Sequence, residues 1–304
     1  MTSGLVIVDK PAGWTSHDVV ARMRGLAGTR KVGHAGTLDP MATGVLVIGV
    51  EKATRLLGHL ALTEKVYEAT IRLGQSTNTD DAEGEITATT SAGDVADDAI
   101  RDGIKALTGP IQQVPPQVSA IKVDGKRAYK LARAGEDVEL KARPVTVHAF
   151  ETGEIRRSGD LVDVDAVITC SSGTYIRALA RDLGAALGVG GHLTALRRTR
   201  VGPYDLTMAH GLDALAEAAD KAKEAGAPRG EQLAAEILPI GDAVAAAFPR
   251  VDLTDDQART VSHGGRVPAA DEAAGPVALF APDGTFLALA EKHGQTYKLL
   301  AVFV

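Results

Sequence analysis

The chain has 304 residues, of which 45% are hydrophobic and 24% are charged. This composition is typical of a folded protein with a substantial core and excludes a largely disordered chain, and the length suggests about two domains. The N-terminal apolar run at residues 5–8 is too short for a signal sequence or a membrane span. A single cysteine, Cys170, cannot form an internal disulfide, and no Cys/His spacing is typical of zinc. We therefore expect a cytoplasmic protein with no structural metal and no membrane anchor.

Charge is unevenly distributed along the chain. The formal net charge is −6, but residues 61–100 alone hold nine acidic and two basic residues. Such a distribution leaves room for local basic patches that bind a polyanion, because binding depends on the field near the phosphates; solvated helix faces are the competing interpretation. Three basic clusters are present: Arg22, Arg24, Arg30 and Lys31; Lys122, Lys126, Arg127, Lys130 and Arg133; and Arg197, Arg198 and Arg200.

In chain order, the first elements surround a glycine-rich loop. Residues 5–13 (LVIVDKPAG) are typical of a strand that ends in a turn, and Ser16 is a candidate cap for a helix that runs to about Leu26. Residues 45–50 (VLVIGV) are too continuously apolar for a strand with a solvent face. Residues 65–74 (KVYEATIRLG) alternate as a strand.

The following elements mix strands and helices. Residues 93–109 have helical spacing, and residues 119–135 predict a strand, an Asp-Gly turn and a helix. Residues 161–187 change from strand alternation to helical period after Gly173. Because no regular strand–helix alternation of a parallel sheet is present, we predict the α+β class.

The last part of the chain predicts a helical segment and a small second domain. Residues 212–235 are rich in alanine, glutamate and lysine and are interrupted at GAPRG. Short strand-like pieces separated by turns follow Pro249 and predict an all-β unit. We divide the chain into a catalytic domain at 1–247 and a C-terminal domain at 248–304.

Familiar catalytic motifs are missing from the sequence. It contains no P-loop and no G-x-S-x-G elbow, and its one GVGGHL stretch lacks the third glycine of a dinucleotide fingerprint. What remains is GHAGTLDPMATGVLVIG at residues 33–49, where Asp39 is the one acidic residue. Pro40 favours an extended or turn conformation at Asp39, and the neighbouring glycines allow close backbone approach. A turn-forming aspartate is the competing interpretation.

Five ordered motifs carry a resemblance to a known family: DKPAGWTSHDVV, RKVGHAGTLDPMATGVLVIG, KVYEATIRLGQSTNTDDAEG, VSAIKVDGKRAYKLAR, and SSGTYIRALARDLG followed by GHLTALRRTRVG. From about residue 5 to 210 the chain resembles the TruB family of bacterial tRNA pseudouridine synthases, which modify the uridine at position 55 of the T-loop. The resemblance implies a pseudouridine synthase fold with a mixed central sheet. The segment after Pro249 is similar in place and size to the family's β-barrel PUA domain, which binds RNA.

The reaction implied by this resemblance gives the lone carboxylate a role. Uridine is detached from C1′ of its ribose, turned and rejoined through C5 with no cofactor. Asp39 matches the family's essential aspartate; attack on the base, attack on C1′ and deprotonation of C2′ all remain open. Tyr67 matches the tyrosine that stacks on the flipped base, and Leu196 matches an apolar pocket residue. Arg177 matches the arginine that pairs with the aspartate and keeps it ionised.

Four further residues match family positions that contact the substrate or shape its site. Lys10 belongs to a Lys-Pro motif that shapes the floor of the site, and His34 matches a histidine that contacts the T-loop near the vacated stack. Tyr175 lies in the TYIR motif and is included among the substrate-binding residues. Asp81 matches a family aspartate, although its acidic, glycine-containing setting is equally typical of a turn.

Two other function classes compete with this interpretation. A catalytically silent RNA-binding module explains the basic patches but gives no reason for Asp39, Tyr67 and Arg177 to match together; without the resemblance, Tyr67 is a core residue and Arg177 a surface charge. A phosphatase using Asp39 requires a second acid where Met41 stands, and no clear carboxylate pair for a glycosidase is present. We expect a monomeric, cofactor-free enzyme that acts on the tRNA T-stem-loop.

Overall fold

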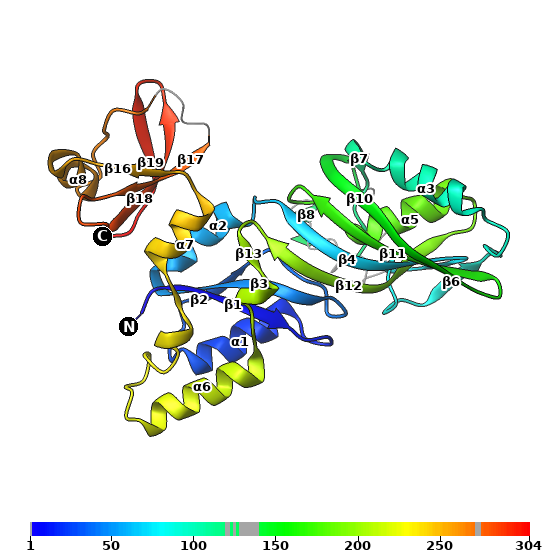
Figure 1. Ribbon diagram of the computed structural model, residues 1–304, viewed down its shortest axis with the longest axis horizontal. Helices are drawn as coiled ribbons and strands as arrows, with labels where there is room; N and C mark the ends of the chain where they lie inside the picture. The colour runs from blue at the N-terminus through cyan, green and yellow to red at the C-terminus, as the bar shows by residue number, and fades with distance from the viewer. Residues whose placement is uncertain (1, 119–121, 124–125, 128–139, 271–274) are drawn as a thin grey trace.

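One mixed sheet forms the centre of the molecule. The computed structural model describes residues 2–118, 122–123, 126–127, 140–270 and 275–304. Within these ranges, eleven strands belong to the central sheet: β1 (Gly4–Lys10), β2 (Val32–Ala35), β3 (Thr43–Val50), β4 (Lys65–Leu73), β7 (Gly109–Gln113), β10 (Arg143–Ser158), β11 (Leu161–Cys170), β12 (Gly191–Val201), β13 (Tyr204–Asp205), β14 (His210–Gly211) and β15 (Leu238–Pro239). The main path is β14-β1-β3-β12-β4-β11-β10-β7 (Figure 1). Together with the helices packed on it, this sheet confirms the α+β class.

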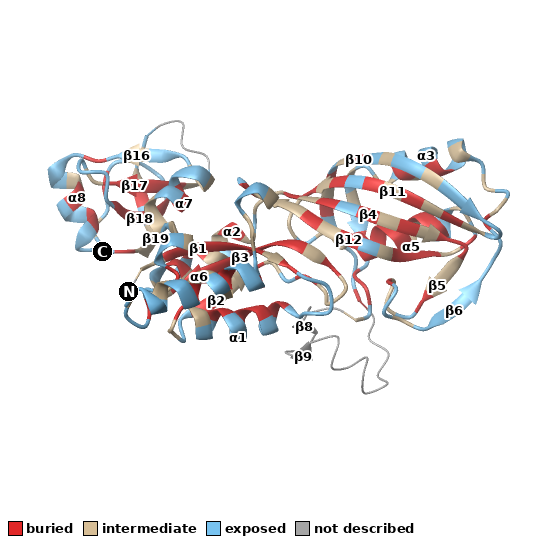
Figure 2. Cartoon of the chain, turned by 60° about the horizontal axis from the view of Figure 1, so that its bottom comes forward, coloured by how far each residue is buried: buried red, intermediate tan, exposed pale blue. Residues whose placement is uncertain are grey.

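Helices pack on both faces of the sheet. Residues of α1 (Ser16–Leu26), α3 (Asp97–Ala106), α5 (Ile176–Ala186) and α6 (Leu212–Glu224) share one apolar cluster with Val6 and Val8 of β1. Residues of η1 (Glu51–Leu56), α2 (Leu57–Leu60) and α7 (Ile240–Ala247) share a second cluster with Leu5 and Ile7. The alternating side chains of β1 therefore face two different cores, and the strands of the sheet centre are buried along most of their length (Figure 2).

Most predicted elements lie where the sequence places them. The strands β1, β3, β4 and β11 and the helices α1, α3 and α5 are confirmed. β3 is buried over nearly its whole length, and β4 alternates between buried residues and half-buried or exposed ones. The capping residue of α1 is Thr15, however, so the prediction of Ser16 as the cap is wrong. Thr15 and Asp18 form a capping box, in which each side chain accepts a hydrogen bond from the other residue's backbone N–H.

The C-terminal segment contains a helix that the sequence analysis missed. In the described part of this segment, four strands pair in the order β16 (Arg250–Asp252), β17 (Pro276–Phe280), β18 (Phe286–His293) and β19 (Thr296–Val302). Between the first two lies α8 (Asp255–Ser262), whose N-cap Thr254 forms a capping box with Gln257. The prediction of an all-β unit is therefore wrong. The Thr-Asp-Asp-Gln pattern at residues 254–257 is a helix signal that could have revealed α8.

The remaining elements are short. The short strands β8 (Lys122–Val123) and β9 (Lys126–Arg127) pair in an antiparallel manner. The predicted Asp-Gly turn, the helix predicted after it and the side chains of the second basic cluster lie outside the described residues. A hairpin of β5 (Gln75–Thr77) and β6 (Ile86–Thr89) and the turns η2 (Leu206–Met208) and η3 (Ala234–Glu236) complete the elements described. None of the described helices is long and apolar enough to cross a membrane.

Candidate active site

The loop that carries Asp39 connects β2 to β3 and is fastened to α1 and β1. The buried Ser16 hydroxyl accepts a hydrogen bond from the Leu38 amide at 2.9 Å and donates one to the Leu38 carbonyl at 3.1 Å. Lys10 Nζ donates to the carbonyl of Pro40 at 3.2 Å and to that of Trp14 at 2.6 Å. The residues on both sides of Asp39 are therefore held in place by neighbouring elements.

Gly44 lets β3 approach β12 closely where the loop ends. β3 and β12 pair in parallel at Thr43 with Arg197 and at Gly44 with Arg198. The φ of Gly44 is +98°, and a Cβ at this position would lie 2.1 Å from the carbonyl oxygen of Arg198. Only glycine fits here.

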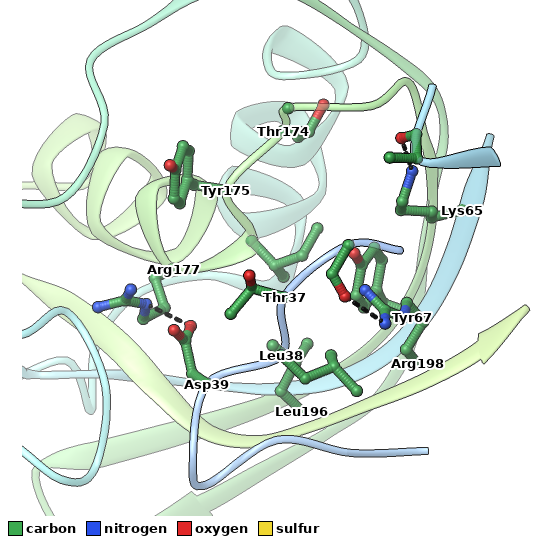
Figure 3. Close-up of a pocket in the computed structure, with 14 residues that line it drawn as sticks. Thr37, Leu38, Asp39, Lys65, Tyr67, Thr174, Tyr175, Arg177, Leu196 and Arg198 are labelled. Carbon is green, nitrogen blue, oxygen red and sulfur yellow. Dashed lines mark hydrogen bonds and ion pairs between the residues drawn. The ribbon is translucent and has the colours of Figure 1, made fainter. Parts of the chain in front are cut away.

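Five of the eight predicted site residues line one pocket. Asp39, Tyr67, Tyr175, Arg177 and Leu196 surround a cavity of about 260 Å³, and Figure 3 shows them facing it from the loop, from β4, from the start of α5 and from β12. Residues that are far apart in the sequence therefore meet as the resemblance implies. Their chemical roles remain predictions.

Arg177 is a buried cation rather than a surface charge. Its side chain is 5% exposed, and its Nε lies 3.0 Å from Asp39 Oδ2. The N–H of this nitrogen is not directed at the oxygen, so the contact is an ion pair rather than a hydrogen bond. Nη1 donates to the Thr79 carbonyl at 2.7 Å and Nη2 to the Val118 carbonyl at 3.0 Å, which fix the orientation of the guanidinium.

Asp81 is part of the same charge network. Its carboxylate lies 3.5 Å from Arg177 Nη1, and the residue is almost fully buried. It accepts hydrogen bonds from the Thr79 hydroxyl at 2.5 Å and from the Glu83 amide at 3.1 Å. Asp81 therefore both shapes a turn and provides a second carboxylate for Arg177, so the two interpretations offered by the sequence are compatible.

Burial raises the pKa of Asp39 above its ordinary value. The Arg177 charge lowers this pKa and the Asp81 charge raises it, but burial is the largest influence. The side chain is still 36% exposed, through the pocket opening. Arg177 therefore offsets part of the effect of burial, and its role in keeping Asp39 ionised remains a prediction.

Lys10 and His34 lie near the Asp39 loop but do not line the pocket. Lys10 is fully buried, and burial lowers its pKa to about 8. The His34 ring packs edge-on against His17 with 5.6 Å between ring centroids, and its Nδ1 has no hydrogen-bond partner among the described residues. Burial lowers the pKa of His34 to about 4, so this imidazole is neutral at physiological pH.

The sequence analysis did not assign two charged pocket residues to the site, Lys65 and Arg198. Arg198 was assigned to a basic cluster for a polyanion, but it is 1% exposed and lines the pocket. Its neighbours in that cluster are paired: Arg197 with Asp9 at 2.7 Å, and Arg200 with Glu64 at 2.7 Å. Arg198 is therefore not part of a surface cluster, while a contact of Arg197 and Arg200 with a polyanion remains a prediction. Strand alternation gave a usable signal for Lys65, because it is two residues from Tyr67 and shares its face.

Comparisons with known proteins agree with this architecture. The model of the TruB family pseudouridylate synthase N-terminal domain matches residues 24–176, the tRNA pseudouridylate synthase B C-terminal domain matches 177–245, and the C-terminal region of tRNA pseudouridine synthase II matches 248–304. The tRNA pseudouridine synthase B of Thermobifida fusca (strain YX) is 62% identical over 309 residues, which cover 100% of this chain and 99% of the relative.

Solved structures show the same fold. A crystal structure of a Cbf5-Nop10-Gar1 complex contains a chain with a TM-score of 0.76 and 30% identity, covering 99% of this chain and 85% of that one. An H/ACA ribonucleoprotein bound to a substrate RNA containing 2′-deoxyuridine gives a TM-score of 0.74 and 29% identity, again covering 99% of this chain and 85% of that one.

The central sheet and the C-terminal sheet unit, which is consistent with a PUA-like domain, thus define a pseudouridine synthase fold. The chain belongs to the TruB family of tRNA pseudouridine synthases, RNA-binding isomerases that convert uridine to pseudouridine in tRNA. This confirms the resemblance found in the sequence. Among the described residues, no group of three or more His, Cys, Asp or Glu side chains is arranged to hold a metal ion.

Proposed function

We propose that this enzyme isomerises the uridine at position 55 of the tRNA T-loop and that Asp39 carries the chemistry. The observation that supports this most strongly is the Asp39–Arg177 ion pair of 3.0 Å at a pocket that Tyr67 and Leu196 also line. A carboxylate beside a fixed cation and an aromatic ring suits a reaction that breaks and remakes one glycosidic bond. An RNA-binding module without catalytic activity would not require a partly exposed carboxylate that is paired with a buried cation.

The target base must leave its stack to reach this pocket. Base flipping costs a few kcal/mol, which stacking and pocket contacts offset. We assign Tyr67 as the stacking partner and Leu196 as an apolar wall, with Tyr175 at the opening. Asp39 then lies beside the ribose, where its carboxylate acts on C1′, on the base, or as the base that removes the C2′ proton.

A second hollow supports binding of the RNA away from the flipped base. Arg24, Arg30 and Arg229 line this hollow of about 490 Å³, and among the described residues no acidic side chain forms an ion pair with any of the three. Its floor lies at the end of α1, whose first turn fastens the Asp39 loop. The helix has 11 residues and is therefore about 16 Å long, with the contact to the Asp39 loop at its first turn and the hollow at its last. We infer that the T-stem backbone extends along α1 to these arginines, with one protein chain per tRNA.

Mapping pseudouridine in an unmodified tRNA transcript tests the proposal. The purified enzyme should convert the T-loop uridine and leave other uridines unchanged. A transcript with cytidine at this position is the matched control and should remain unmodified. Pseudouridine at another position in the wild-type transcript, or in the control, would contradict the assigned site.

A further inference from the structure

Two buried cations lie at the end of the pocket away from Asp39. Lys65 is 5% exposed and Arg198 is 1% exposed, and both line the cavity. Figure 3 shows them on the Tyr67 side, while Asp39 and Arg177 lie on the opposite side. Among the described residues, no acidic side chain forms an ion pair with either of them. Since burying an unpaired charge costs free energy, their positions need an explanation.

Backbone carbonyls fix both cations without neutralising them. Lys65 Nζ donates to the carbonyls of Ala61 at 2.8 Å and Thr63 at 2.7 Å. Arg198 Nε donates to the Val45 carbonyl at 2.8 Å, and its Nη2 donates to the Gly36 carbonyl at 2.9 Å. A carbonyl oxygen satisfies a hydrogen bond but carries no net charge, so this end of the pocket remains positive.

We propose that Lys65 and Arg198 stabilise the negative charge that forms on the uracil ring when the glycosidic bond breaks. The proposal rests on the proposed function, which stacks the base on Tyr67 and puts the ribose beside Asp39. When the C1′–N1 bond breaks, its electron pair stays on N1 and spreads onto O2 and O4. The ribose is compensated either by bonding of C1′ to the Asp39 carboxylate or by transfer of the C2′ proton to it. The base anion then turns, and its C5 bonds to C1′ either by displacing the Asp39 carboxylate or by adding to the C1′–C2′ double bond while Asp39 returns the proton to C2′. C5 finally loses its proton and N1 gains one, which gives pseudouridine.

Fixed charges suit this task because they need no reorganisation as the transition state forms. The groups that face Lys65 are Arg198 from β12, Cys170 from β11 and Tyr67 from β4, with Asp39 across the pocket. Burial raises the pKa of the Cys170 thiol to about 11 and also raises that of Tyr67, so both are neutral. Burial, followed by the Arg198 charge, lowers the pKa of Lys65 to about 8. Lys65 is therefore cationic at neutral pH and loses its charge in mildly alkaline solution.

Lys65→Met tests the proposal because it removes the charge and keeps the chain length. The control is Lys52→Met, since Lys52 Nζ also donates to a backbone carbonyl, that of Phe303 at 2.9 Å, but lies outside the pocket. Single-turnover reactions with saturating enzyme would use transcripts that contain uridine or 5-fluorouridine at the target position. The rate of each reaction is measured as the loss of the N-linked nucleoside. Fluorine stabilises the base anion, so a reaction on this substrate depends less on the cations.

We expect Lys65→Met to slow cleavage of uridine about 100-fold, as for loss of one oxyanion donor, and that of 5-fluorouridine much less. The dissociation constant for tRNA should not change, and Lys52→Met should match the wild type. Equal slowing on both substrates, an unchanged rate, or a loss confined to tRNA binding would overturn the proposal. If the wild type makes no pseudouridine in the T-loop, the proposed function fails instead.

Lys65→Arg provides a second test that does not depend on the methionine variant folding. The wild-type single-turnover rate should fall as the pH rises through about 8, where the Lys65 pKa lies. Arginine stays charged, so its variant should retain activity and show a smaller alkaline decline than the wild type; the remaining decline would be that of Lys10, whose pKa is also about 8. Identical pH profiles for the two proteins would overturn the role of the Lys65 charge.

Discussion

At the scale of single residues, Asp39 is a carboxylate that the fold makes harder to ionise. Its pKa is raised by burial, although Arg177 lies 3.0 Å away. A group whose pKa is higher in the folded than in the unfolded state binds protons more readily when folded. Its charged form therefore lowers the stability of the folded protein at neutral pH. Such a cost is typical of a residue retained for chemistry.

Asp39→Asn should therefore not lower the melting temperature at pH 7. Because the side chain is 36% exposed, we expect no change or a small rise. The difference from the wild type should vanish as the pH falls through the raised Asp39 pKa, where the wild-type carboxyl is also neutral. Thermal unfolding measured across this pH range checks the prediction.

Asp165→Asn is the matched control, because the pKa of Asp165 is shifted in the opposite direction to that of Asp39. Arg156 and Thr70 hydrogen-bond to Asp165 and lower its pKa. Asparagine at this position should lower the melting temperature at pH 7, and the loss should shrink as the pH falls through the lowered pKa. If Asp39→Asn lowered the melting temperature at pH 7 as much as Asp165→Asn does, the Asp39 carboxylate would stabilise the fold, which contradicts the prediction.

At the scale of elements, α1 supports the active loop through one residue of its first turn. The Ser16 hydroxyl satisfies both the amide and the carbonyl of Leu38. Ser16→Ala leaves these buried groups without a partner, which costs about 1–3 kcal/mol of stability. Because Leu38 precedes Asp39, we also expect a slower chemical step. Melting temperature and single-turnover rate measure the two effects separately.

Thr15→Ala distinguishes loss of helix stability from loss of loop geometry. It removes the capping box of the same helix and costs about 1 kcal/mol. Thr15 has no hydrogen bond to the Asp39 loop among the described residues. The variant should melt earlier and retain the wild-type rate. Equal slowing in both variants would mean that general stability, rather than the Leu38 contact, controls the chemistry.

Most helices and strands could be predicted from local sequence pattern, whereas the pairing of the strands in the sheet could not. Alternation on β4 predicts that Tyr67 is inside, and the motif resemblance places Arg177 near Asp39. The role of Arg198 depends on β12 pairing with β4 on one side and with β3 on the other. That contact joins residues more than 150 positions apart, so no local pattern reveals it. Three nearby arginines therefore predicted one surface cluster, although each has a different environment.

At the scale of the whole molecule, the C-terminal sheet shares a core with the rest of the chain. Phe280, Phe286 and Phe303 belong to the same apolar cluster as Leu5 and Val244. Lys52 and Arg55 of η1 also donate hydrogen bonds to the carbonyls of Phe303 and Val302. The division at residue 248 remains a prediction, and this contact implies that the two parts stabilise each other.

Removal of residues 248–304 should lower the melting temperature, because it exposes part of this apolar cluster. If the truncated protein folds, we expect a raised KM for tRNA and an unchanged kcat, which is the result of losing uniform binding. The segment has more acidic than basic residues, so its phosphate contacts are few. A slow chemical step with unchanged tRNA affinity would show that this segment supports the active site directly.

Electrostatic binding of tRNA should depend on the arginines that line the hollow at the end of α1. Arg30→Ala and Arg229→Ala should each weaken tRNA binding and reduce the slope of log affinity against log salt by about 1. Arg101 of α3 is the control, because it already pairs with Asp98 at 3.4 Å at the other end of the sheet (Figure 1). Unchanged slopes for Arg30→Ala and Arg229→Ala would exclude this hollow from the RNA path.

The most direct test of the central claim compares wild type and Asp39→Asn in a single-turnover reaction on unmodified tRNA. The account predicts that the wild type converts the T-loop uridine, while Asp39→Asn forms no pseudouridine and binds the tRNA within about tenfold of wild-type affinity, since affinity comes from many phosphate contacts. Turnover by Asp39→Asn near the wild-type rate would contradict the assignment of Asp39 as the catalytic residue.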